Sequence, residues 1–167
     1  MSEDVFIQTV PEDPLIAPVI AGLFGEYRDR YGEFFANRPA EDDRAFSAPD
    51  GMLIVLLRNA EPIAMGAYKR YDPQTAELKR IWTQRALRRQ GLAQKVLHEL
   101  ERRAVAHGYR RLFLTTGFRQ PEAVGLYLSH GYQPLFDTRL DPEVYSRPPY
   151  DGRLPFTKTL KVGLPVS

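Results

Sequence analysis

Residues 76–93 read AELKRIWTQRALRRQGLA, and this stretch decides the fold that we expect. Its first part, Ala76–Thr83, has the composition of a strand, and a helix with an apolar stripe is predicted over Gly91–His107. The amides at a helix N-terminus have no partners within the helix and bind phosphate readily. The glycine at its start lets a ligand come close to the backbone, and Arg88 and Arg89 add positive charge. The stretch therefore predicts a phosphate-binding strand–loop–helix unit, although an ordinary helix start with solvated arginines would look the same.

The rest of the chain predicts a mixed sheet with several helices. Strands are expected at Val5–Val10, Met52–Arg58, Ile63–Arg70, Arg111–Thr115 and Phe156–Leu160, and helices at 18–31, Ala40–Phe46 and Pro121–His130. Residues 133–155 are rich in proline and are expected to form a long irregular connection that covers one side of a site. Hairpins come first and strand–helix alternation follows, which is typical of a mixed sheet in an α/β protein.

Length and composition limit the possible classes of protein. A chain of 167 residues with 43% hydrophobic residues fits one domain, residues 1–167, with a substantial core. There is no cysteine, which excludes disulfides, a thiolate nucleophile and a Cys-ligated zinc. The longest apolar run, Met52–Leu57, is far shorter than the roughly 20 residues of a membrane span. The acidic start MSED does not resemble a secretory signal, so we expect a cytoplasmic protein that does not enter a membrane.

Charge is distributed unevenly along the chain. Residues 1–50 contain eleven acidic and four basic side chains, whereas residues 79–111 contain ten basic and two acidic ones. A solvated helix face explains such a bias, and so does an anionic ligand, with phosphate the obvious candidate. Duplex nucleic acid is not expected as a partner, because the acidic first third would repel it. The three histidines show no metal-ligand spacing, so no metal is expected, and no Gly-x-Ser-x-Gly hydrolase motif is present.

Several segments of the chain resemble those of the GNAT-type N-acetyltransferases, in the order and spacing of that family. Arg88-Arg89-Gln90-Gly91-Leu92-Ala93 is similar to the family's [Gln/Arg]-x-x-Gly-x-[Gly/Ala] signature. Further segments resemble the family's fourth strand, the helix that follows it, its Ala-x-x-Leu-Tyr ending and its closing strand: Ala76–Trp82, Leu97–Gly108, Ala123–Tyr127 with Gly131-Tyr132, and Pro155–Leu160. The resemblance covers about residues 50–160. The chain departs from the pattern at Arg85 and Ala86, where the family commonly has Pro, at Thr83 in place of an aliphatic residue, and at Gln120 in place of an occasional Asn.

The resemblance implies a GNAT-type acyl-CoA N-acyltransferase fold, with a central twisted mixed sheet flanked by helices on both faces. It implies that the sheet splays near Trp82 and that the co-substrate is acetyl-CoA. The implied coenzyme-binding residues are Ile81, Trp82, Thr83, Arg88, Arg89, Gln90, Gly91, Leu92, Ala93 and Gln94. The implied activity is acetyl transfer to an amine of a small molecule by direct attack in a ternary complex, and a homodimer is compatible with it.

Direct acyl transfer to an amine requires a base and an acid. An amine with a pKa of about 10.4 costs roughly 4.6 kcal/mol to deprotonate at pH 7, so a base must take up a proton. Glu77 is the candidate base, in a strand whose alternation is expected to place it on one face with Lys79, Ile81 and Thr83. By resemblance, this is where several members of the family keep a catalytic glutamate, but an ion pair with Lys79 or Arg80, or a role in orienting substrate, also explains the residue.

Tyr127 is the candidate acid, because its phenol is protonated at pH 7 and can donate to a departing thiolate, although a core aromatic residue would show the same spacing. An aromatic and charged helix segment is expected to wall the acceptor site, with Tyr27, Tyr31 and Phe35 as the contact residues and with Glu26, Arg30, Glu33 and Phe34 beside them. Packing of the helix on the sheet is the alternative. Two other functions remain open at this point. One is a non-catalytic module that binds or senses acyl-CoA, and the other is a basic nucleic-acid-binding protein that uses residues 79–111.

Overall fold

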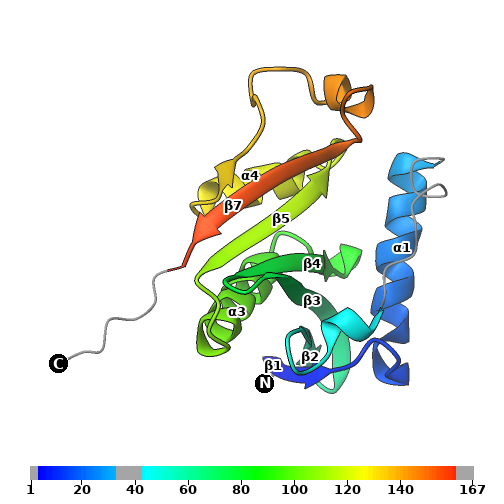
Figure 1. The fold of residues 1–167 in the computed structure, drawn as a ribbon. Coiled ribbons are helices and arrows are strands. Elements are labelled where there is room, and N and C mark those ends of the chain that lie inside the picture. The colour runs from blue at the N-terminus through cyan, green and yellow to red at the C-terminus, as the bar shows by residue number, and fades with distance from the viewer. Residues whose placement is uncertain (1–3, 33–42, 161–167) are drawn as a thin grey trace.

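The computed structural model describes residues 4–32 and 43–160 (Figure 1). The strands are β1 (Asp4–Thr9), β2 (Met52–Arg58), β3 (Glu61–Asp72), β4 (Thr75–Thr83), β5 (Arg111–Gly117), β6 (Gln133–Pro134) and β7 (Arg153–Thr159). The helices are α1 (Ala17–Tyr31), α3 (Leu92–Ala106) and α4 (Pro121–Ser129), with short 3₁₀ turns η1 (Pro14–Ile16), η2 (Asp43–Phe46), η3 (Arg85–Leu87) and η4 (Pro142–Ser146).

The strands form one seven-stranded sheet in the order β1-β2-β3-β4-β5-β7-β6. Every neighbouring pair is antiparallel except β4 and β5, which are parallel and are joined through α3. A parallel pair needs a crossover connection, and the helix predicted after the phosphate loop provides it. The predicted mixed sheet of an α/β protein is therefore confirmed.

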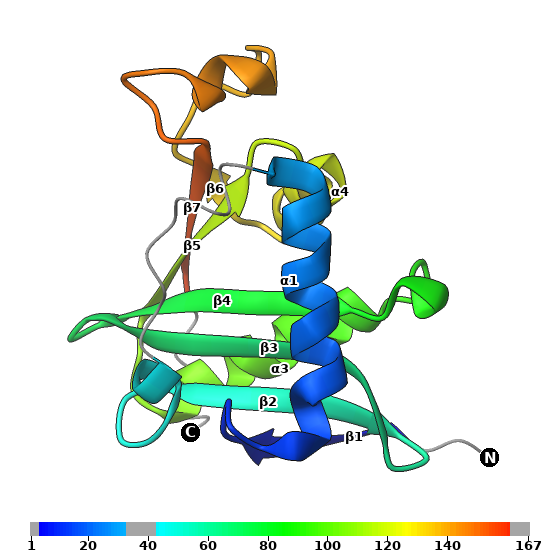
Figure 2. The ribbon, with the colours of Figure 1, turned by 90° about the vertical axis from the view of Figure 1, so that its right-hand side faces the viewer.

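Helices cover both faces of the sheet and create two apolar clusters. α1 packs on one face of β2 and β3 with Leu23, Leu53 and Met65 in the shared core (Figure 2). α3 and α4 pack on the opposite face, where Leu100, Tyr127 and many other side chains are buried. Burial of apolar surface contributes about 25 cal/mol per Å², so these two layers hold the central strands in place.

The parallel pair β4–β5 separates part of the way along its length. The two strands are paired only from Thr75 to Leu78 on β4 and from Arg111 to Leu114 on β5. Beyond these residues β4 continues to Thr83 beside β3, while β5 leans away with β7, as Figure 1 shows. The expected splay is therefore present, and it leaves the last backbone groups of β4 without a neighbouring strand on the β5 side.

A β-bulge changes the faces of β4 and corrects one sequence-based expectation. Met65 pairs with Trp82 and Ala67 with Lys79, so two residues of β4 lie opposite the single Gly66, and Arg80 has a positive φ of 58°. The expected alternation placed Glu77, Lys79, Ile81 and Thr83 on one face, and this is wrong. The extra residue reverses the side-chain direction, so Trp82 shares the α1 face, whereas Ile81 packs with the α3 cluster.

Other predictions hold with small changes at the ends of elements. Pro18 lies in the first turn of α1, and Gly131, with a φ of 84°, follows α4 as expected. The segment 133–155 is not irregular throughout, because it contains β6 and η4. The helix expected at Ala40–Phe46 is a 3₁₀ turn over Asp43–Phe46, and residues 40–42 lie outside the described residues.

Candidate functional site

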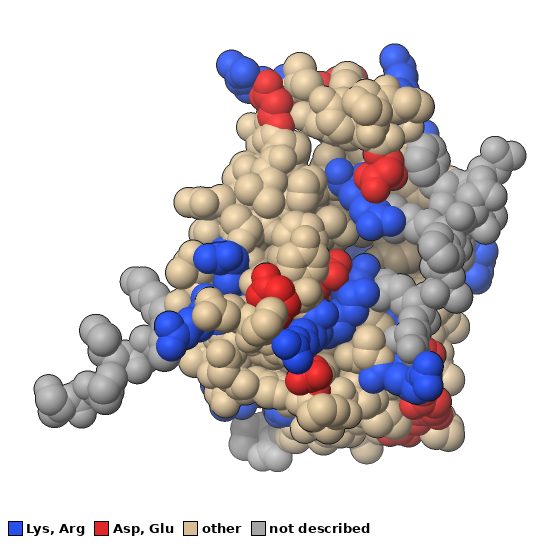
Figure 3. All heavy atoms as spheres, viewed as in Figure 1, with Lys and Arg blue, Asp and Glu red and all other residues tan. Residues whose placement is uncertain are grey.

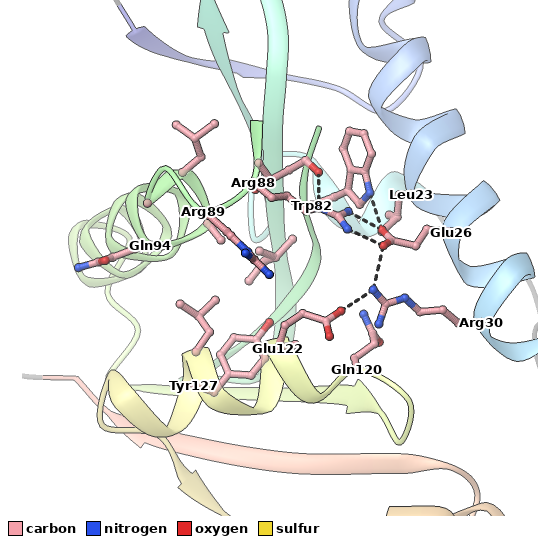
Figure 4. Close-up of a pocket in the computed structure, with 17 residues that line it drawn as sticks. Leu23, Glu26, Arg30, Trp82, Arg88, Arg89, Gln94, Gln120, Glu122 and Tyr127 are labelled. Atoms are coloured by element: carbon pink, nitrogen blue, oxygen red, sulfur yellow. Dashed lines mark hydrogen bonds and ion pairs between the residues drawn. The ribbon is translucent and has the colours of Figure 1, made fainter. Parts of the chain in front are cut away.

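A cavity of about 570 Å³ opens where β4 and β5 separate (Figure 4). Its walls come from the C-terminal end of β4, the loop before α3, the first turn of α3, one side of α4 and the middle of α1. The lining residues are Leu23, Glu26, Arg30, Ile81, Trp82, Thr83, Arg88, Arg89, Gly91, Leu92, Ala93, Gln94, Gln120, Glu122, Ala123, Leu126 and Tyr127. Nine of the ten residues expected to bind a coenzyme line this cavity, and Gln90 is the exception.

The first turn of α3 presents its backbone amides to the cavity. Gly91 is the N-cap residue and has a left-handed backbone with φ of 75°, and no acidic side chain lies in the first turn. A Cβ on Gly91 would meet no described atom within 4 Å, so there is open space over the backbone at this point. Unpaired amides and the positive end of the helix favour an anion here. A phosphate group therefore fits this end of the cavity.

Most of the basic side chains between residues 79 and 111 have acidic partners. Arg102 and Arg103 contact Glu99, Lys95 lies 3.6 Å from Asp4, and Arg80 bonds to Asp43. Figure 3 likewise shows acidic side chains beside the Lys and Arg side chains on the face of the molecule that it presents. The basic excess in the sequence is therefore largely neutralised within the fold and does not favour nucleic acid.

Arg89 differs from these arginines. Among the described residues it has no acidic partner, and Figure 4 shows its side chain pointing into the cavity between α3 and α4. Its backbone is left-handed, with φ of 67°, a conformation that non-glycine residues seldom adopt. Arg89 therefore supplies positive charge beside the amides of α3.

A carboxylate on α1 binds the other arginine of the loop. Glu26, which is 8% exposed, accepts hydrogen bonds from Arg88 Nη1 and Nη2 at 2.7 and 2.6 Å, and from Trp82 Nε1 at 2.9 Å. Arg30 Nη2 donates to the same carboxylate at 3.0 Å and contacts Glu122 on α4 (Figure 4). The hydrogen bonds from Arg88 lower the pKa of Glu26 from 4.5 to about 2, against the opposing effect of its burial. Glu26 therefore stays ionised and fully bonded at neutral pH, which makes it a poor proton acceptor.

Tyr127 lies on the α4 wall and is the predicted acid that the structure brings to the cavity. It is 6% exposed, its ring packs against Tyr132 and Phe156, and its hydroxyl points into the cavity in Figure 4. Burial raises the pKa of Tyr127 well above its ordinary value, and the nearby Tyr27 adds to the effect. The phenol is therefore protonated throughout the neutral range and acts as a hydrogen-bond donor.

Glu77, the predicted base, does not line the cavity. It is 9% exposed on β4, before the bulge, where its carboxylate lies 3.6 Å from Lys79 Nζ and 4.0 Å from Lys69 Nζ. Lys69 and Lys79 contact it from the α1 side of the sheet, the side that also bears Trp82.

The residues expected to wall the acceptor site have different positions. Tyr27 and Tyr31 lie on α1 and are half-buried outside the cavity lining, and Phe35 lies outside the described residues. The Tyr31 hydroxyl donates to Gln120 Oε1 at 2.9 Å, and the amide of Gly117 donates to the same oxygen at 3.1 Å. Tyr31 therefore orients Gln120, which does line the cavity.

Sequence reasoning did not assign a site role to five of the lining residues from α1, from α4 and from the residue before α4: Leu23, Gln120, Glu122, Ala123 and Leu126. Glu26 and Arg30, which belong to the charged helix segment expected to wall a site, do line the cavity and form an ion pair four residues apart along the helix. The contact between Glu26 and Arg88 has no local signal in the sequence, since it joins residues 62 positions apart.

None of the helices in residues 4–32 and 43–160 combines the length and apolar character of a segment that spans a bilayer. In the same ranges, no three His, Asp or Glu side chains form a group suited to a metal ion.

Comparison with known proteins agrees with the geometry. Residues 20–132 match the model of the acetyltransferase (GNAT) family. A search of curated protein sequences found no match. Among solved structures, an acetyltransferase of the GNAT family from Staphylococcus aureus is similar with a TM-score of 0.70 and 14% identity, over 95% of this chain and 100% of that one.

Two further structures contain a coenzyme. A GNAT family acetyltransferase from Elizabethkingia anophelis with acetyl-CoA bound has a TM-score of 0.63 and 16% identity, over 94% of this chain and 98% of its own. An N-acetyltransferase from Thermoplasma acidophilum in complex with coenzyme A has a TM-score of 0.66 and 13% identity, over 94% and 99% of the two chains. These likenesses show the fold, and the family match shows the class of enzyme. The chain is therefore an acyltransferase that belongs to the acetyltransferase (GNAT) family.

Proposed function

We propose that this protein transfers an acetyl group from acetyl-CoA to an amine nitrogen of a small molecule, by direct attack in a ternary complex. The main support is that one cavity joins the open amides of α3 and Arg89 at one end to the Tyr127 hydroxyl in the splay of the sheet. A long donor with an anionic diphosphate and a reactive thioester needs both features in one channel.

The donor would lie along the last residues of β4. The amides near Gly91 and the guanidinium of Arg89 would bind the diphosphate, as helix N-termini and arginines do in other proteins. Beyond Leu78 the backbone of β4 has no strand partner on the β5 side. The N–H and C=O groups of Ile81–Thr83 that face away from β3 would therefore pair with the amides of the pantetheine arm, apart from the Thr83 oxygen, which accepts from Arg88 Nε.

The acetyl end would lie between β4 and Tyr127. A β4 amide would polarise the thioester carbonyl, an interaction typically worth a few kcal/mol in acyl transfer. The amine nitrogen forms the new C–N bond, the C–S bond breaks, and the phenol of Tyr127 hydrogen-bonds to the departing sulfur. Because burial raises the pKa of Tyr127, complete proton transfer from it is uphill, and we expect a contribution of about 10²-fold, the lower end of general acid catalysis.

The proton that the attacking amine loses needs an acceptor, and Glu77 is proposed for this step through a chain of water molecules. The conservative variant Glu77→Gln tests it. We expect kcat/KM to fall most at low pH, where less of the amine is neutral, while coenzyme A binds unchanged. If Glu77 only pairs with Lys69 and Lys79, the variant will lose stability but will keep the wild-type pH profile.

A screen of primary amines that detects free thiol release from acetyl-CoA tests the function as a whole. The expected result is turnover with at least one small amine, followed by mass spectrometry that finds an added acetyl group on nitrogen. Tight coenzyme binding with no turnover over a broad panel would favour the alternative, a non-catalytic acyl-CoA sensor.

A further inference from the structure

The contacts of Glu26 extend beyond a single ion pair. Its Oε1 accepts from Arg88 Nη1 at 2.7 Å and Arg30 Nη2 at 3.0 Å, and its Oε2 accepts from Arg88 Nη2 at 2.6 Å and Trp82 Nε1 at 2.9 Å. Arg85, with a 72% exposed side chain, lies 3.9 Å away. One buried carboxylate thus joins α1 to the end of β4 and to the loop that precedes α3.

The three guanidinium nitrogens of Arg88 all donate hydrogen bonds to the protein. Its Nη1 and Nη2 form a forked pair with Glu26, and its Nε donates to the backbone oxygen of Thr83 at 3.2 Å. A bidentate arginine–carboxylate pair constrains direction as well as distance. The guanidinium of Arg88 therefore determines how the loop leaves β4, and Arg89, the next residue, points into the cavity.

We propose that Glu26 is a positioning residue for the donor: it fixes Arg88 on α1 and thereby holds the loop 84–91 in the conformation that binds the diphosphate. This inference rests on the proposed function. The same helix also bonds to the far side of the splay, where Arg30 Nη1 donates to the Arg119 backbone oxygen and Arg119 Nη1 donates to that of Arg30, both at 2.9 Å. The loop is thus held by an element that bridges both halves of the sheet.

Removal of the Glu26 charge would have two opposing effects on the affinity for an anionic ligand. Removing the charge of Glu26 would release Arg88 and Arg30 near the donor, and simple attraction would then tighten the binding of an anion. Loss of loop position would weaken it, because the aligned amides would no longer converge on the diphosphate. The sign of the change in dissociation constant therefore distinguishes a positioning carboxylate from one that merely competes with the ligand.

The experiment is calorimetric titration of coenzyme A into the wild type, Glu26→Gln, Arg88→Lys and the double variant. We expect each single variant to raise the dissociation constant about tenfold or more. The dissociation constant of the double variant is expected to be close to that of the single variant that binds more weakly, because both changes break the same link. Glu99→Gln is the matched control, since Glu99 also binds two arginines but lies away from the cavity.

Trp82 gives a second readout, because it is the only tryptophan and its Nε1 bonds to Glu26. Its emission is expected to shift in Glu26→Gln and to stay unchanged in Glu99→Gln. If Glu26→Gln is too unstable to titrate, Arg88→Lys keeps the charge, removes the fork and tests the same link.

The outcomes separate this inference from the proposed function. Unchanged or tighter binding in Glu26→Gln, or additive effects in the double variant, would overturn the positioning role while the wild type still binds coenzyme A. Failure of the wild type to bind coenzyme A would overturn the proposed function together with the inference.

Discussion

Gly22 on α1 lies directly against the indole of Trp82 on β4: a Cβ added to Gly22 would come within 2.5 Å of Cη2 and 2.6 Å of Cζ2. The close approach of the helix to the strand brings Glu26, one turn further along α1, to the indole N–H and the Arg88 guanidinium. The glycine therefore sets the distance between the helix and the phosphate loop.

Gly22→Ala is expected to destabilise the protein by about 1–3 kcal/mol, because the new methyl group overlaps the rigid indole, and this exceeds the gain of about 1 kcal/mol from replacing a helical glycine. Gly25→Ala on the same helix is the control. Its Cβ would meet only Arg28 Nη2, at 3.9 Å, so we expect a small gain in stability. Urea denaturation measures both, and equal effects of the two substitutions would contradict the close packing.

Glu26 makes stability depend on acid pH. Its folded pKa of about 2 lies below the ordinary 4.5, so its contribution is fully present above pH 4.5 and is lost as the pH falls toward 2. The difference corresponds to no more than about 3 kcal/mol. Unfolding free energies of the wild type and Glu26→Gln should therefore differ most near pH 7 and converge near pH 2–3. A difference that stays constant over this range would show that the charge of Glu26 does not stabilise the fold.

The end of the cavity at Gly91, where we expect the diphosphate, can be tested by comparing Gly91→Ala with Gly108→Ala. Gly108 lies just after α3 and serves as the control. Both have positive φ, 75° and 101°, and a Cβ on either would meet no described atom within 4 Å. Alanine at either position is expected to cost about 1–2 kcal/mol of backbone strain. We expect only Gly91→Ala to weaken coenzyme A binding in calorimetry, because its methyl group projects where the ligand would lie. Equal affinities in the two variants would place the diphosphate elsewhere.

Tyr127→Phe tests the acid. We expect kcat to fall about 10²-fold with little change in coenzyme affinity, because the ring contacts with Tyr132 and Phe156 remain and only the hydroxyl is lost. Tyr132→Phe is the control, since it loses a hydrogen bond to Glu101 next to the same ring but does not line the cavity. Wild-type kcat in Tyr127→Phe would exclude the phenol from the chemistry.

The sequence allowed the mixed sheet, the strand–loop–helix unit around Gly91 and the place of Tyr127 beside it to be predicted, because each depends on local signals: apolar periodicity, a glycine at a helix start and the spacing of a short motif. The bulge at Arg80 was missed, since a two-residue alternation continues through it unless the partner strand is known. The link between Glu26 and Arg88 was missed because its members are far apart in sequence and are brought together only when α1 packs on β4. Tertiary packing, rather than local propensity, therefore determines the α1 side of the cavity.

A crystal structure of the complex with acetyl-CoA tests the central claim most directly. The account predicts the diphosphate on the amides of residues 89–94, the pantetheine arm beside Ile81–Thr83 and the thioester sulfur within hydrogen-bonding reach of the Tyr127 hydroxyl. Donor density at another place on the protein, with the space over Gly91 left to water, would contradict it.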